Sequence, residues 1–134
     1  MRHSEPLRAL MLLRRVESQV AQMRLMDEHQ ARGRAAVALR DRVDALRSEA
    51  SAAGGDAFAA WLPAARDGAG QAATGLALAE ARLSDASAVA ASAHLAEKAA
   101  TEAVRTRDRA RRALNLAREQ QRLSDIASAG DAAT

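Results

Sequence analysis

The longest regular pattern in the sequence runs from Leu76 to Asp125, a stretch without proline or glycine. Positions spaced alternately by three and four residues form one stripe there, which is typical of a helix packed lengthwise on another helix. The positions are Leu76, Ala79, Leu83, Ala86, Ala90, Ala93, Glu97, Ala100, Val104, Arg107, Arg111 and Leu114. The stripe is mostly alanine as far as Val104 and then becomes basic.

Two further stripes at helical spacing occupy the first third of the chain. The first consists of Ala9, Leu13, Val16, Val20 and Met23, and the second of Leu25, His29, Arg32, Ala36, Leu39, Val43, Leu46 and Ala50. We expect these stripes to pack against the long helix, with a change of phase between Met23 and Asp27. Ser4 is the expected N-cap of this first helix.

The clearest break is the segment 51–56, which reads Ser-Ala-Ala-Gly-Gly-Asp. Gly54 can adopt the left-handed conformation that ends a helix, and Asp56 can cap the next one. Two long helices joined by a short turn fold back on each other, because each has an apolar stripe to bury. The sequence therefore predicts an all-α fold, an antiparallel coiled-coil hairpin in one domain.

The expected first helix covers about residues 5–52, the turn about 53–56, and the longer second helix about 57–128. Pro63 and the glycines that follow it predict a kink or a weakened helix at 62–75. About two dozen residues at the end of the second helix then extend past the start of the first. A reversal at 67–70 is the alternative, and it would pair Leu7 and Leu10 with Ile126 and Leu123.

Composition changes the expected stability more than the expected fold. The chain has one Phe, one Trp and no Tyr, and about a quarter of it is alanine. A buried alanine contributes far less than the roughly 1.5–3 kcal/mol of a buried leucine, so the core should be thin. No stretch approaches the ~20 apolar residues of a membrane span, and the first residues do not resemble a signal peptide. We expect a cytoplasmic protein.

The charge pattern and the candidate chemistry exclude several classes of function. The net charge is +3, and all but one of the twenty basic residues are arginine. This balance alone is too mild to indicate nucleic-acid binding, and the basic segment 105–122 contains no aromatic residues on which bases could stack. His3, His29 and His94 do not have zinc-ligand spacing, and no acid or nucleophile has an expected pocket. We expect no enzymatic activity, no metal and no cofactor.

Two groups of residues are candidates for binding another protein. The first is the only bulky cluster, Phe58, Trp61 and Leu62 with Ala65 on the same face; it either fills the turn end of the hairpin or anchors a partner. The second is the basic end of the long helix. This end is an ordinary charged surface, or it meets an acidic protein surface or pore; contact with nucleic acid is the third option.

The sequence resembles the small coiled-coil stalk proteins of flagellar and type III secretion export ATPases, the FliJ/YscO family. The resemblance covers most of the chain: its size, the two helices, a Trp-Leu pair near the start of the second helix, and the closing segment 115–127, NLAREQQRLSDIA. In this family, basic and amide residues likewise precede an acidic, hydrophobic and alanine-containing close.

The resemblance implies that the end bearing the termini inserts into the hexameric export ATPase and that the rod contacts the cytoplasmic domain of the membrane export gate. It also implies possible contacts with export chaperones, a location at the inner-membrane export apparatus, and a monomer when free. The residues implied for the ATPase ring are Leu7, Leu10, Arg111, Arg118, Arg122, Leu123 and Ile126.

Gate contact in the family involves an aromatic and small residues early in the second helix. Counting back from Ile126, the aromatic falls on Trp61 and the next positions on Ala65, Gly68 and Ala72. Glycine and alanine at these positions depart from the family's pattern. A generic coiled-coil adaptor or scaffold, unrelated to secretion, is the alternative function.

Overall fold

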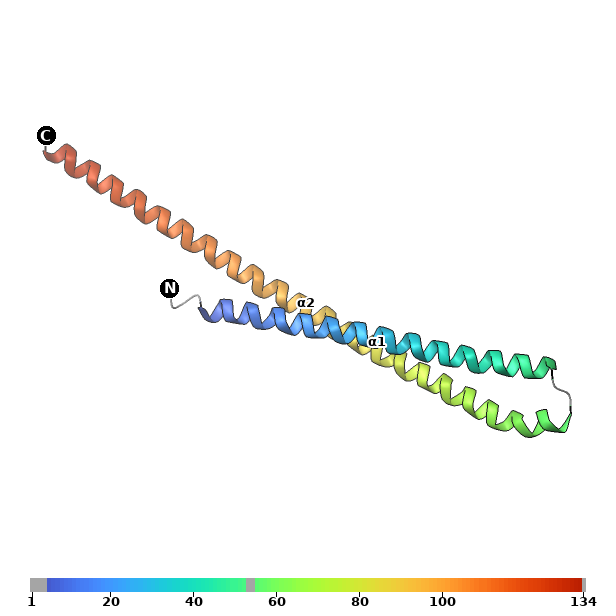
Figure 1. Ribbon diagram of the computed structural model, residues 1–134. Helices are drawn as coiled ribbons and strands as arrows, with labels where there is room; N and C mark the ends of the chain where they lie inside the picture. Colours follow the sequence, from blue (N-terminus) through green and yellow to red (C-terminus); the bar gives the residue numbers. More distant parts are fainter. Residues whose placement is uncertain (1–4, 53–54, 134) are drawn as a thin grey trace. The chain divides into compact units, whose positions relative to one another are not determined.

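The computed structural model describes residues 5–52 and 55–133, and almost all of them are helical (Figure 1). Helix α1 spans Glu5–Ala52 and helix α2 spans Asp56–Ala133. The described residues contain no strand, and the two helices pack against each other. The predicted helical hairpin is confirmed, and α2 continues to Ala133, past residue 128 at which it was expected to end.

The chain reverses between Ala52 and Asp56. Residues 67–70 lie inside α2, so the alternative reversal at that position is wrong. Gly55 has a φ of 106°, a conformation that glycine adopts without strain, and its carbonyl accepts a hydrogen bond from the Ala59 N–H at 3.2 Å. Asp56 is therefore the first helical residue and not the cap, and it lies where helix dipoles favour an acid. The predicted roles of Ser4 and Gly54 fall outside the described residues.

Pro63 lies within the second turn of α2, and the helix continues through it. A proline cannot donate the backbone hydrogen bond that would reach back to the carbonyl of Ala59. This loss occurs close to the helix start, where it affects few other turns. Every residue of the segment 62–75 is helical, so the chain does not leave the helix there. The kink or weakening predicted for this segment stays a prediction.

Contacts divide the chain into two compact units. The turn unit is Glu17–Ala93, and the terminal unit is Met1–Val16 together with His94–Thr134. Each unit contains part of α1 and part of α2. The described residues contain no helix that is long and apolar enough to cross a membrane.

Small side chains form the core of the turn unit. Its buried residues are Ser18, Ala21, Ala79, Ala86 and Ala90. Alanine and serine allow two helix backbones to approach closely, but each contributes little apolar area. At the edge of this contact, Arg32 of α1 forms an ion pair with Glu80 of α2 at 3.4 Å.

The terminal unit buries Ala100 and Val104 of α2. Ion pairs of described residues join its helices, among them Arg8 with Asp108 at 3.1 Å and Arg15 with Glu97 at 3.7 Å. Side chains this exposed to solvent contribute about 0–1 kcal/mol per pair. Beyond this contact, α2 continues from Arg112 to Ala133 with every residue exposed.

The stripe predicted for α2 is confirmed almost completely. Every one of its positions from Leu76 to Arg111 is buried or half-buried. The exception is Leu114, which is exposed because it lies past the last residue of α2 that packs on α1. The residues of α2 that pack on α1 could therefore be predicted from the long alanine-rich repeat.

The first stripe predicted for α1 is wrong. Its described positions are all exposed, including Leu13, Val16 and Val20. The residues that are buried or half-buried are Leu7, Met11, Arg14, Ser18, Ala21, Leu25 and Glu28. This set already alternates by four and three and runs into the second predicted stripe at Leu25, so no change of phase near Met23 is required.

The second predicted stripe of α1 is confirmed in part. Leu25, Ala36, Leu39, Val43 and Leu46 are half-buried. The other three positions of that stripe are exposed, namely His29, Arg32 and Ala50. For Arg32 the physical reason is its ion pair with Glu80, which lies at the edge of the helix contact.

Candidate partner-binding surfaces

The C-terminal part of α2, residues 112–133, is exposed along its whole length (Figure 1). It carries large apolar side chains that are more than half exposed: Leu114, Leu116, Leu123 and Ile126. Leu116, Leu123 and Ile126 are spaced by seven and three residues, so they share one face of the helix. Arg112, Arg118 and Arg122 lie on the same segment. An apolar face with arginines beside it fits a helix that docks into a groove of another protein.

Most helical stability in proteins comes from packing, and an isolated helix of this length is marginal in water. Within residues 112–133, Gln121 Nε2 donates a hydrogen bond to Asp125 Oδ1 at 3.1 Å, a contact one turn away on the same helix. Every residue of this segment is exposed, so packing on the described part of α1 buries none of them. We therefore expect its helix to be strengthened by a binding partner.

Sequence reasoning placed four ring-binding candidates in this segment: Arg118, Arg122, Leu123 and Ile126. Arg111 lies at its start and is half-buried, whereas Leu7 is half-buried and Leu10 exposed on the α1 part of the same unit. Leu116 was missed. Its seven-residue spacing to Leu123 was the available signal.

The aromatic cluster lies in the turn unit, at the start of α2. The rings of Phe58 and Trp61 are 5.8 Å apart between centroids and are inclined by 37°. Trp61 has 36% of its surface exposed, while Phe58 and Leu62 are half-buried. The two rings contact each other, and about a third of the Trp61 surface stays accessible.

A small hollow of about 190 Å³ adjoins this cluster. It is lined by Trp61, Ala64 and Ala65 of α2 and by Arg42 and Ala45 of α1. The Arg42 guanidinium lies against Gly68, where an added Cβ would come within 2.9 Å of its Nη1. Arg42 was not predicted as part of this surface, because its proximity to Trp61 depends on the register between the two helices.

The three positions that follow Trp61 in the family's gate contact are less exposed than Trp61 itself. Ala65, Gly68 and Ala72 are half-buried. Of the predicted gate-binding residues, Trp61 and Ala65 thus line one hollow, and Phe58 contacts Trp61 from the preceding turn.

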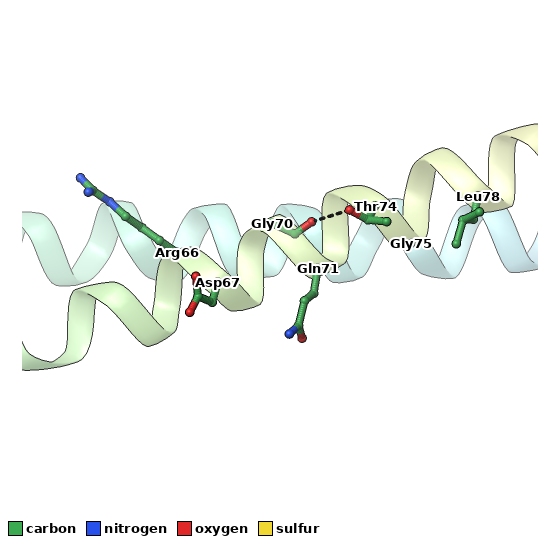
Figure 2. A pocket seen from close by; sticks show the side chains of 7 residues that line it. All are labelled: Arg66, Asp67, Gly70, Gln71, Thr74, Gly75 and Leu78. Carbon is green, nitrogen blue, oxygen red and sulfur yellow. Dashed lines mark hydrogen bonds between the residues drawn. The ribbon is translucent and has the colours of Figure 1, made fainter.

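Farther along α2, a shallow depression lies on the exposed face of the helix (Figure 2). Its lining residues are Arg66, Asp67, Gly70, Gln71, Thr74, Gly75 and Leu78. The Thr74 hydroxyl donates a hydrogen bond to the Gly70 carbonyl at 3.1 Å, a bond that bends helices slightly. Gly70 and Gly75 leave the depression open, since no atom lies within 4 Å of where their Cβ atoms would be.

We expect Gly70→Ala combined with Gly75→Ala to raise the free energy of unfolding by about 1–2 kcal/mol. Each glycine in a helix interior costs roughly 0.5–1 kcal/mol relative to alanine, and both sites have room for a methyl group. Urea denaturation followed by circular dichroism measures the change. Gly68→Ala is the matched control, and its gain should be smaller because the methyl group displaces Arg42. A gain for Gly68→Ala as large as half the gain of the double variant would contradict this explanation.

The metal-ligating side chains of the described residues lie apart from one another. No group of three or more His, Asp or Glu side chains is placed to hold a metal ion in the part of the chain that is described. His29 and His94 are exposed, and His3 lies outside the described residues.

No family model matches the chain, and no curated protein or solved structure shows a significant match to it.

Proposed function

We propose that this protein is a non-catalytic central-stalk component of a flagellar or type III protein export apparatus. In this role it inserts into the hexameric export ATPase and links that ring to the cytoplasmic domain of the membrane export gate. The observation that carries the proposal is the exposed helical segment 112–133 at the end of α2. Its residues 115–127 also carry the resemblance to the stalk family.

The segment has the chemistry that a ring interior requires. A shaft inside a ring makes many shallow contacts, and a free helix offers its side chains on all sides. Arg118 and Arg122 are available for acidic groups of the ring, while Leu123 and Ile126 offer apolar contacts. The start of α1 belongs to the same unit, so Leu7 and Leu10 extend this surface.

The hairpin core is consistent with such a role. Alanines at the contact bring the two helix backbones close together, so little cross-section is added by side chains between them. Of the described residues in the terminal unit, Ala100 and Val104 are the ones that are buried. A thin, two-helix stem of this kind suits a partner that surrounds it.

Stimulation of a purified export ATPase is the experiment that tests the proposal. The full chain is titrated into the ATPase, and hydrolysis and ring assembly are followed together. We expect both to rise with added protein, and the rise to weaken at high salt because arginines contribute to the contact. A chain that neither binds nor stimulates export ATPases from several secretion systems would refute the proposed function.

The Phe58/Trp61 cluster is the proposed contact with the export gate, and export chaperones are further candidate partners. We expect Trp61→Ala to weaken gate binding by more than about 1 kcal/mol, since tryptophans at contact centres often dominate binding energy. Calorimetric titration with the cytoplasmic gate domain measures the change. Leu78→Ala is the control, because Leu78 is an exposed apolar residue of α2 outside the cluster. The gate assignment fails if both variants bind as the unmodified chain does.

A coiled-coil adaptor or scaffold is the second candidate function. The observation that favours it is the row of exposed apolar residues on α1, which includes Leu13, Val16 and Val20. A stalk that works alone inside a ring has no evident use for that row. An adaptor joins helices of several chains and would use it.

A further inference from the structure

A stripe of large apolar side chains runs along the side of α1 that does not pack on α2. This outer stripe consists of Leu12, Leu13, Val16, Val20, Met23 and Met26, and these residues are 53–66% exposed. Single exposed apolar residues are ordinary, but six neighbours on one helix face mark a contact surface. The surface is not explained by the hairpin, whose own contact uses Ser18, Ala21 and Leu25.

The spacing of the outer stripe indicates that its partner is also a helix. Leu13, Val16, Val20 and Met23 alternate by three and four residues, as the core positions of a coiled coil do. Leu12 and Met26 lie beside this line on the same flank. The helix α1 thus carries two seams, of which the hairpin occupies one.

The stripe is also symmetrical along the chain, which points to a second copy of the same helix. Leu13 and Met23 lie five residues to either side of Ser18, and Val16 and Val20 lie two residues to either side. In an antiparallel pair, Leu13 therefore meets Met23 of the other copy, and Val16 meets Val20. A two-fold interface requires this kind of self-complementary patch.

The flanking positions favour the antiparallel over the parallel arrangement. Antiparallel pairing places Leu12 beside Met26 of the second copy and brings the two Gln19 amides together at the two-fold axis. Parallel pairing would place Leu12 beside the carboxylate of Glu17. The antiparallel arrangement brings the two Glu17 residues near each other on the opposite flank, and this repulsion limits its strength.

We propose that the protein self-associates as an antiparallel dimer through the outer stripe of α1. The stripe covers roughly 21 Å of helix at 1.5 Å per residue, which is less than a standard interface needs. The dimer is therefore weak, with a Kd on the order of 100 µM. The stripe contains none of the residues assigned to the ATPase ring or the export gate, so the dimer does not depend on the proposed function. It replaces the expected monomer only at high protein concentration.

Sedimentation equilibrium of the full chain tests the association, over concentrations from about 10 µM to about 1 mM. We expect the average mass to rise toward that of a dimer. Val16→Asp should weaken association at least tenfold, and the uncharged Val20→Gln should weaken it as well. Val37→Asp is the matched control, because Val37 is exposed on α1 outside the stripe. A monomer at every concentration, or equal association of the Val16 and Val37 variants, overturns the proposal.

Cysteine cross-linking tests the direction of the pair. The chain has no cysteine of its own, so every disulfide must come from an introduced residue. Gln19→Cys should form a covalent dimer rapidly on mild oxidation, because residue 19 meets its counterpart only in the antiparallel pair. Gln22→Cys, one turn away on α1, should cross-link slowly. If Val20→Cys cross-links faster than Gln19→Cys, the antiparallel arrangement is refuted.

Discussion

Ala86→Asp is expected to lower the free energy of unfolding by about 3 kcal/mol, because it places an unpaired carboxylate in the closest part of the helix contact. Ala86 is 1% exposed and Ala90, one turn away, is 2% exposed. The other buried residues described in the turn unit are alanines and a serine, so none of them is a cation that could pair with the new charge. Urea denaturation followed by circular dichroism at 222 nm measures the change.

Ala88→Asp is the matched control for this prediction. Ala88 is exposed on the same helix two residues away, so its replacement has the same intrinsic cost in helix propensity without burying a charge. We expect a loss of less than about 1 kcal/mol for the control. Similar denaturation midpoints for the two variants would show that α1 does not cover Ala86 in solution.

Removal of residues 115–128 is expected to abolish stimulation of the export ATPase while leaving the packed part of the hairpin intact. All of these residues are exposed, so their loss removes no contact between α1 and α2. The ion pair of Arg8 with Asp108 and the buried Val104 both precede the deletion. The expected functional loss follows from the proposal that this segment enters the ring, and an ATPase assay measures it.

A shorter deletion of residues 129–134 is the control, since it shortens the same end of the chain and retains Leu116, Leu123 and Ile126. We expect it to stimulate the ATPase as the full chain does. Circular dichroism should report the same denaturation midpoint for both deletions and the full chain, because neither deletion reaches the packed core. Full stimulation after loss of 115–128 would place the ring contact elsewhere.

The fold could be predicted from the sequence because two strong local signals agree. The alanine repeat of α2 runs through ten turns in one phase, and the glycines at 54 and 55 follow the first helix directly. The position of the reversal then decides which residues of the two helices meet. The 3-4 pattern of α2 and the position of the glycine pair together predict that the first helix packs antiparallel on α2, and in approximately which register.

The face that α1 buries could not be predicted by choosing its most apolar stripe. Leu13, Val16 and Val20 are more hydrophobic than Ser18 and Ala21, yet the smaller residues are the ones that are buried. The alanine surface of α2 is the reason: a helix approaching it closely needs small side chains opposite, and leucines would hold the backbones apart. The hydrophobicity of α1 alone does not reveal that small side chains are needed at this contact.

The candidate surfaces were predicted to different extents, because some of their residues have a local signal in the sequence and others depend on how the two helices pack. Trp61 and Phe58 stand out in a chain with no other aromatic residue. Arg42 joins their surface through the register of two helices, which no single segment of sequence encodes. Leu116 had a local signal in its spacing to Leu123, whereas the exposure of Leu114 depends on where α1 begins.

The ion pairs between the helices have a consequence for alignment. A seam of nearly identical alanines would fit almost equally well if one helix slid along the other by a heptad, a step of about 10 Å. Arg8, Arg15 and Arg32 of α1 each meet an acid on α2, namely Asp108, Glu97 and Glu80. Such a displacement would separate all three couples at once. Exposed ion pairs that add little stability can in this way favour one register between two helices whose contact surfaces are repetitive.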